Sequence, residues 1–139
     1  MFSSGEHRTA TEILAREIMF VSPDANRDRL LKHLSFSANG LLENWDLGRC
    51  KIAKLPESCG DVMCTGDLDL QGNRLESLPL SFGTLSVGGG LILYDNNLRC
   101  LPPNFEQIRV GGNLFLDGNP ELTGIPTEFP NVKGKVYRP

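Results

Sequence analysis

The feature that most constrains this chain is an internal repeat with a step of 23 residues. A motif of leucine, any residue and leucine recurs with that step at Leu68/Leu70, Leu91/Leu93 and Leu114/Leu116. The same step leads back to Trp45 and Leu47. A fixed period of this length is typical of repeat architectures, in which one unit cannot bury its apolar side chains alone but stacked units can. The repeat therefore decides the fold class.

Several other columns keep the same register. They are the asparagines Asn73, Asn96 and Asn119 (Cys50 in the first copy), the prolines Pro56, Pro79, Pro102 and Pro126, and the phenylalanines Phe82, Phe105 and Phe129 (Cys59 first), where Pro126 and Phe129 come one residue late because of an insertion. The two leucines of each motif should share one face of a short strand. The asparagine amide can bond backbone groups in the turn after the strand, and Leu-Pro favours an extended return arm. Phenylalanine then fills the interior from the other side. The pairs Gly88-Gly89 and Gly111-Gly112 should allow a tight bend into the next strand.

The combined pattern, LxLxxNxLxxLPxxFxxLxVGG, resembles the leucine-rich-repeat family over about residues 41–133. Its LPxxF half is similar to 23-residue repeats with an extended return arm, and its VGG ending to bacterial variants. The resemblance implies an α+β solenoid with a parallel sheet on its concave face. Its four turns would be residues 41–63, 64–86, 87–109 and 110–133, followed by a C-terminal edge at 134–139. Trp45, Cys50, Cys59 and an insertion at 119–122 depart from the pattern, as end repeats often do.

Residues 1–40 lack the repeat and carry two helix signals. Thr9 and Glu12 indicate a capping box, followed by a mostly apolar stripe at Ile13, Leu14, Glu17 and Ile18. Ser22-Pro23-Asp24 reads as a second helix start, with a stripe at Leu30, Leu31, Leu34 and Phe36 and a stop at Asn39-Gly40. We predict a helical hairpin that caps the first strand of residues 41–139, in one cooperative domain. That the helix pair also forms a docking surface stays open.

Composition and charge exclude several function classes. The net charge is −3 and the pI is near 5.4, so no clustered basic surface argues for nucleic acid. No apolar run approaches the roughly 20 residues of a membrane-spanning helix, and no secretory signal pattern begins the sequence. We expect a cytoplasmic protein with no membrane partner. Because a helical cap before short repeats is similar to the repeat domains of bacterial effectors, export into a host cell by a route without a signal stays open.

Catalytic and metal-binding motifs are not found in the sequence. Cys50, Cys59 and Cys64 occupy columns filled elsewhere by packing residues, so we predict that they are buried, whereas Cys100 should face solvent. Cys59 and Cys64 lack the second pair and the nearby histidines of a zinc site. Free thiols fit a reducing compartment, although a disulfide stays open. Neither histidine has a nucleophile or carboxylate placed beside it by a motif. We predict no enzyme, no cofactor and no metal.

The candidate site is the outward face of the predicted sheet. The residues before, between and after each leucine pair should point away from the core. The predicted partner-binding residues are Asp46, Asp67, Asp69, Gln71, Ile92, Tyr94, Asn113, Phe115 and Asp117. This face is acidic in its N-terminal half and apolar and aromatic in its C-terminal half.

An apolar patch with a polar rim is typical of a partner site, and the acidic flank favours a basic segment in the partner. We therefore predict a protein-interaction module that binds a protein or peptide through this face. Two alternatives stay open. Ile92, Tyr94 and Phe115 could serve only to favour β structure, or the chain could be a structural or assembly subunit that uses its helical cap or its open C-terminal edge. The sequence does not predict the oligomeric state.

Overall fold

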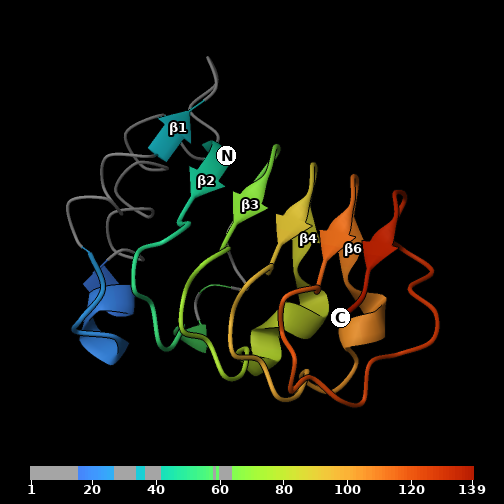
Figure 1. The fold of residues 1–139 in the computed structure, drawn as a ribbon. Coiled ribbons are helices and arrows are strands. Elements are labelled where there is room, and N and C mark those ends of the chain that lie inside the picture. Colours follow the sequence, from blue (N-terminus) through green and yellow to red (C-terminus); the bar gives the residue numbers. More distant parts are fainter. Residues whose placement is uncertain (1–15, 27–33, 37–41, 58, 60–63) are drawn as a thin grey trace.

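The structure is a computed structural model of the chain, and it describes residues 16–26, 34–36, 42–57, 59 and 64–139. Within these residues the protein is α+β, with mostly parallel strands and few helices (Figure 1). The predicted α+β class and the parallel sheet are confirmed at this level.

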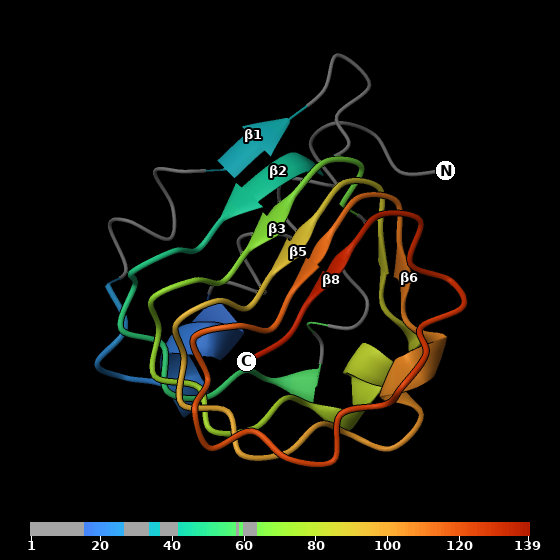
Figure 2. The same ribbon diagram turned by 45° about the vertical axis from the view of Figure 1, so that its right-hand side comes forward.

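Six strands form the main sheet, in the order β1-β2-β3-β5-β7-β8. They are β1 (Leu34–Phe36), β2 (Leu42–Asp46), β3 (Leu68–Asp69), β5 (Leu91–Ile92), β7 (Leu114–Phe115) and β8 (Val136–Tyr137). From β2 to β8 every neighbouring pair is parallel, and the strands lie side by side (Figure 2). A second, two-stranded parallel sheet joins β4 (Ser86–Val87) to β6 (Arg109–Val110).

The register of the six-stranded sheet follows the repeat. Trp45 pairs with Leu68, Leu68 with Leu91, and Leu91 with Leu114. All four side chains are almost completely buried, as are their partners two residues later, Leu47, Leu70, Leu93 and Leu116. The predicted alignment of the leucine column is therefore confirmed.

The phenylalanine column closes the core from the other side. Phe82, Phe105 and Phe129 are buried, and the rings of Phe105 and Phe129 meet edge to face with centroids 6.1 Å apart. Two of the three lie in short 3₁₀ helices, η2 (Leu80–Thr84) and η3 (Phe105–Gln107), which lie side by side (Figure 1). The return arm is thus not extended throughout. It turns where the N–H groups of Phe82 and Phe105 donate to the carbonyls of Pro79 and Pro102.

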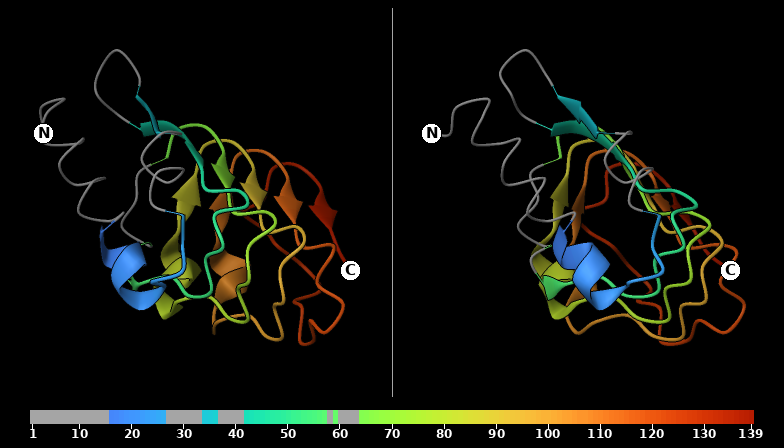
Figure 3. Two further views of the ribbon diagram at one scale, coloured as in Figure 1. Left: turned by 60° about the vertical axis from the view of Figure 1, so that its left-hand side comes forward. Right: turned by 90° about the vertical axis from the view of Figure 1, so that its left-hand side faces the viewer.

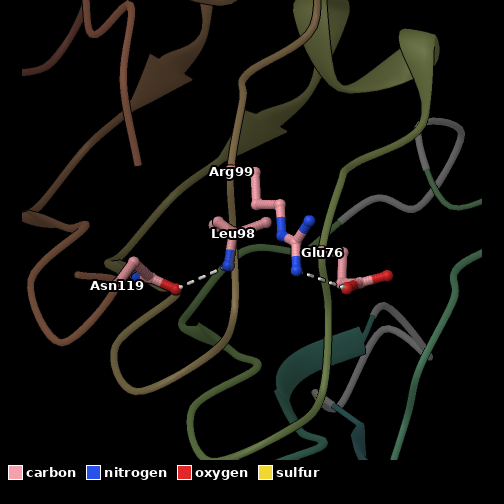
Figure 4. Close-up of polar contacts among 4 residues, drawn as sticks. All are labelled: Glu76, Leu98, Arg99 and Asn119. Carbon is pink, nitrogen blue, oxygen red and sulfur yellow. Dashed lines mark hydrogen bonds and ion pairs between the residues drawn. The ribbon is translucent and has the colours of Figure 1, made fainter. Parts of the chain in front are cut away.

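The asparagine column forms a buried hydrogen-bonded ladder. Asn96 Oδ1 accepts from the Leu75 N–H at 3.2 Å, and its Nδ2 donates to the carbonyls of Leu70 and Leu93 at 2.9 and 3.1 Å. Asn119 repeats the arrangement one turn later and accepts from the Leu98 N–H at 3.1 Å (Figure 4). Each amide therefore ties its own turn to the preceding one and satisfies backbone groups that water cannot reach.

The structure requires glycine in these pairs for a reason other than the predicted tight bend. A Cβ at Gly88 would overlap the backbone carbonyl of Thr65, and one at Gly111 would overlap the carbonyl of Gly88. Neither glycine has a positive φ. Close approach of neighbouring backbone segments therefore requires glycine here, rather than a bend that only glycine could adopt.

The predicted second helix is wrong at both of its described ends. Residues 23–25 form a turn after a helix at 16–21, and Leu34–Phe36 is strand β1, antiparallel to β2. Leu-Ser-Phe alternates with the period of a strand, and pairing satisfies the edge of β2 that would otherwise be open. The Ser22 hydroxyl does not cap a helix but accepts from the Ala53 N–H at 2.8 Å. The remaining predicted signals, at 7–15, 27–33 and 37–41, lie outside the described residues.

The helix at 16–21 and the turn after it pack against the first copy of the repeat. Ile18 is fully buried in the core, and the Asn26 N–H donates to the Cys50 carbonyl at 2.7 Å. Two views show this helix at one end of the row of strands (Figure 3). Part of the predicted first helix is therefore seen, with its predicted apolar residue Ile18 facing the core.

The other end of the sheet is strand β8. Val136 pairs with Leu114, so it occupies the position of the first leucine, and Arg138 falls in the position of the second. The Arg138 guanidinium donates to the carbonyls of Pro126 and Thr127 at 2.8 and 3.1 Å and lies 5.6 Å from the Phe129 ring centroid. The Arg138 guanidinium therefore lies against the last phenylalanine of the column, and its NH1 and NH2 groups are bonded to backbone carbonyls.

Candidate partner-binding site

One outward residue from each parallel strand lies in a row across the six-stranded sheet. The surface formed by this row and the residues that flank it is here called the sheet face. By strand pairing, Asp46 lies beside Asp69, Asp69 beside Ile92, Ile92 beside Phe115, and Phe115 beside Tyr137. The first four were predicted to share this row, and the structure brings them together. Tyr137 was missed because Arg138 replaces the second leucine. The available signal was Val136, which follows Leu114 by 22 residues and not 23.

The C-terminal half of the sheet face is aromatic. The rings of Phe115 and Tyr137 are stacked, with centroids 4.7 Å apart and planes inclined by 2°. Tyr94, which follows β5, is 42% exposed, and Tyr137 is 39% exposed. Ile92 and Phe115 are half-buried. These four side chains place apolar surface at the solvent boundary, although the sheet has a separate buried face.

The N-terminal half of the sheet face is acidic, and Asp46 and Asp69 accept hydrogen bonds from residues two positions later in the chain. Asp69 Oδ1 accepts from the Gln71 N–H at 3.0 Å, and Asp69 Oδ2 accepts from the Gln71 amide at 2.9 Å. Asp46 Oδ1 accepts from the Gly48 N–H at 3.0 Å in the same way. Within the described part of the chain, neither Asp67 nor Asp69 is paired with a lysine or arginine. Their charges are therefore not neutralised there.

Two of the predicted binding residues also hold the fold together. Asp67 Oδ1 accepts from the Gly90 N–H at 2.7 Å, and Asn113 Oδ1 accepts from the Lys135 N–H at 2.8 Å. Asn44 Oδ1 does the same for the Asp67 N–H at 2.8 Å. Each of these three side chains bonds a backbone N–H of the next turn. The sequence signal was an acceptor side chain in the position before Trp45, Leu68 and Leu114, which Gly90 interrupts before Leu91.

Asp117 and Gln71 lie at the far ends of their strands, on the rim of the row. Both are half-buried. Asp117 Oδ1 is buried and has no hydrogen-bond partner from the described residues, whereas its backbone carbonyl accepts from the Asp95 N–H at 3.2 Å. All nine predicted residues therefore lie on or beside the sheet face. The side chains of Ile92, Tyr94 and Phe115 make no hydrogen bond with the described residues, so the structure explains their position on this face least.

A second feature lies elsewhere on the molecule. A depression of about 440 Å³ follows β4 and β6, and its lining includes Ser86, Arg109, Asn131 and Lys133. It involves none of the predicted binding residues. Leu80, on η2, is exposed and is also not one of the predicted binding residues. A substitution at Leu80 can therefore serve as a control for substitutions on the sheet face.

The cysteines are where the columns predicted them. Cys50, Cys59 and Cys64 are buried, Cys100 is exposed, and all four thiols are free. Burial raises the pKa of Cys64 to about 11, although backbone N–H groups of Gly66 and Trp45 oppose the rise. The pKa of Cys59 is raised further, by burial and by the charges of Glu17 and Glu57. Thiols held in the protonated form are weak nucleophiles, which fits packing residues.

Within the described residues, no group of three or more histidine, cysteine, aspartate or glutamate side chains could hold a metal ion. In the same part of the chain, no helix has the length and apolar character needed to cross a membrane. No model of a known protein family matches the sequence, and neither the curated proteins nor the solved structures compared with it include a match. The resemblance to leucine-rich repeats therefore remains an interpretation of the motif.

Proposed function

We propose that this chain is a leucine-rich-repeat solenoid that binds a partner protein or peptide through its sheet face. The observation that carries the proposal is the row Asp46, Asp69, Ile92, Phe115 and Tyr137, whose members lie side by side and alternate with the buried leucine columns. Uniform columns build the interior, whereas this column changes from acidic to aromatic. A surface that is free to vary and exposes apolar groups is suited to recognition.

The solenoid interpretation is supported by the spacing of the backbone contacts. The backbone N–H of Trp45 donates to the carbonyl of Asp67 in the next copy of the repeat. The same bond joins Leu68 to Gly90 and Leu91 to Asn113, so each bond links one copy to the next. Figure 3 shows the successive turns stacked behind one another. In this interpretation residues 1–40 cap the N-terminal end, with a helix at 16–21 and strand β1 as the described parts of that cap.

The charge of the sheet face indicates the kind of partner. Asp67 and Asp69 have no lysine or arginine partner among the described residues and lie next to an apolar surface, so a partner segment that carries lysine or arginine would gain Coulomb attraction and a faster encounter. We propose a role as a binding module, with neither catalysis nor a bound cofactor. We further propose a reducing, cytoplasmic compartment, which the four free thiols favour.

The experiment is partner capture with a triple variant, Ile92→Ala, Tyr94→Ala and Phe115→Ala. The side chains of Ile92, Tyr94 and Phe115 are exposed or half-buried and lie outside the buried core, so the melting temperature should stay close to that of the unmodified protein. Capture of any specific partner should be lost, because central aromatic and aliphatic groups dominate binding energy at interfaces.

The matched control is Leu80→Ala, which also removes an apolar side chain, 67% exposed, but outside the sheet face. It should retain every partner. If the triple variant captures the same proteins as the control, the proposed site is wrong.

A second candidate function is assembly through strand β8. It is the last strand in the order of the six-stranded sheet, and no described strand pairs with the edge that faces away from β7. The substitution Val136→Pro would discriminate, because proline lacks the N–H that an added strand needs. Loss of assembly in that variant, with the triple variant unaffected, would favour this function.

A further inference from the structure

We propose that the occupant of the sheet face is a polyproline-II segment with a lysine or arginine three residues before a proline. This inference depends on the proposed function and adds the conformation and spacing of the ligand. It follows from the order of chemical groups along the row and from the distance that separates them.

The distance comes from the strand register. Asp69, Ile92 and Phe115 belong to three successive parallel strands. Neighbouring strands lie about 4.8 Å apart, so the acidic and aromatic positions are separated by about 9.6 Å. A ligand that crosses the strands must therefore present a cationic group and an apolar group on the same side with that spacing.

Regular peptide conformations differ in whether they meet this requirement. In a polyproline-II helix residues i and i+3 share one edge and lie about 9.3 Å apart. In an extended strand the side chains on one face lie about 6.6 or 13 Å apart, which falls short of the required spacing or exceeds it. An α-helix reaches about 10.5 Å only with seven residues. The polyproline-II spacing fits with the shortest ligand.

The aromatic half of the face is suited to proline. The parallel rings of Phe115 and Tyr137 are stacked face to face, and Tyr94, which follows β5, has 42% of its surface exposed. The Tyr94 ring also approaches Gly118 closely, since a Cβ there would be 3.1 Å from Tyr94 Cε2. Grooves lined by aromatic rings are a recurring way to bind proline-rich segments, whose preformed conformation lowers the entropy lost on binding.

The acidic half of the sheet face then sets the direction in which the peptide binds. The Asp69 carboxylate is held by both hydrogen bonds from Gln71, and Asp67 is held by the Gly90 N–H. These bonds hold each carboxylate in place, and neither has a cationic partner in the described part of the chain. A cationic side chain at position i would be attracted to them while proline at i+3 lies over Phe115. Reversal of the peptide would place the cation on the aromatic rings.

The test is selection from a random peptide library displayed on phage, with the whole chain as bait and the triple variant of Ile92, Tyr94 and Phe115 as counter-selection. We expect enrichment of lysine or arginine at i and proline at i+3. A synthetic peptide with that spacing should bind at least ten-fold more tightly than one with a single residue inserted between the two positions.

Two variants assign the halves of the site. Asp69→Asn keeps the acceptor for the Gln71 N–H but removes the charge, so it should weaken the peptide about ten-fold and reduce the salt dependence of binding. Tyr137→Ala should lower the preference for proline over alanine at i+3, and Tyr137→Phe should restore it. Circular dichroism melting checks that each variant folds.

The outcomes separate the two proposals. Peptides that depend on the sheet face but show no basic residue and proline at this spacing, or show a spacing of seven, would overturn the inference and leave the proposed function intact. If selection returns no peptide that distinguishes the bait from the triple variant, both proposals fail.

Discussion

The buried asparagine ladder and the sheet face recur along the chain with nearly the same step, yet they differ in how much each copy may vary. In the ladder, each of Asn73, Asn96 and Asn119 accepts an N–H of the preceding turn and donates to a carbonyl of that turn and to one of its own. On the sheet face, equivalent positions hold aspartate, isoleucine, phenylalanine and tyrosine. A buried column must satisfy the same backbone groups in every turn, whereas an exposed column needs only to tolerate a strand. Stability and recognition are therefore assigned to separate columns of one repeat.

The largest effect is expected for Asn96→Ala. The change leaves the Leu75 N–H without its buried acceptor and removes one of two amide donors from each of the Leu70 and Leu93 carbonyls, which Asn73 and Asn119 still bond. It should cost about 2–3 kcal/mol of unfolding free energy. Urea denaturation measures it. The control is Asn97→Ala, the same substitution at the neighbouring exposed position, which should change stability by less than about 0.5 kcal/mol. Equal losses in the two variants would contradict the division between columns.

The buried thiols should make stability fall in alkaline solution. In the unfolded chain a thiol titrates near pH 8.5, as estimated from model peptides. In the folded protein the pKa of Cys64 is about 11. Between these values the unfolded state binds fewer protons than the folded state, so the unfolding free energy decreases as pH rises and the contribution of Cys64 is fully present only below about pH 8.5.

Valine occupies the equivalent positions Val87 and Val110, so Cys64→Val should fold normally and flatten part of the alkaline decline. Denaturation midpoints at pH 7, 9 and 10 provide the measurement. Parallel profiles for the variant and the unmodified protein would show that Cys64 does not cause the decline.

A smaller effect is expected at the C-terminal end of the core. Arg138→Ala removes two hydrogen bonds and the contact with the Phe129 ring from an exposed position, so it should cost about 1 kcal/mol. Lys135→Ala removes a nearby cation whose side chain makes no such bonds and should be neutral in thermal melting. A neutral result for both variants would mean that Arg138 does not cover the core.

The smallest effect on stability, and the largest contrast with the ladder, is expected for Tyr94→Ala. Its side chain is 42% exposed, and its loss should change the unfolding free energy by no more than about 0.5 kcal/mol while it weakens partner binding. A calorimetric unfolding scan and a binding titration on the same sample measure the two effects. Destabilisation comparable to that of Asn96→Ala would indicate that Tyr94 serves the fold.

The sequence alone determined the repeat, the buried columns, the register of Trp45, Leu68, Leu91 and Leu114, and the row that holds Asp46, Asp69, Ile92 and Phe115. It could do so because each repeat places the same side chains in the same environment, so the period carries the structural information. Prediction from the sequence pattern failed outside the 23-residue repeat. Leu34–Phe36 became a strand because the open edge of β2 required a partner, a demand that no local propensity reports.

Only the tertiary structure decided what individual polar groups do. Asp67 and Asn113 were predicted to bind a partner, yet their carboxylate and amide oxygens each accept a backbone N–H from the following turn. Tyr137 joined the aromatic stack because β8 pairs with β7 after a 22-residue step, despite the loss of the second leucine. Both results depend on distances between turns, and a hydrogen bond or a ring contact exists only once the neighbouring turn has been placed in space.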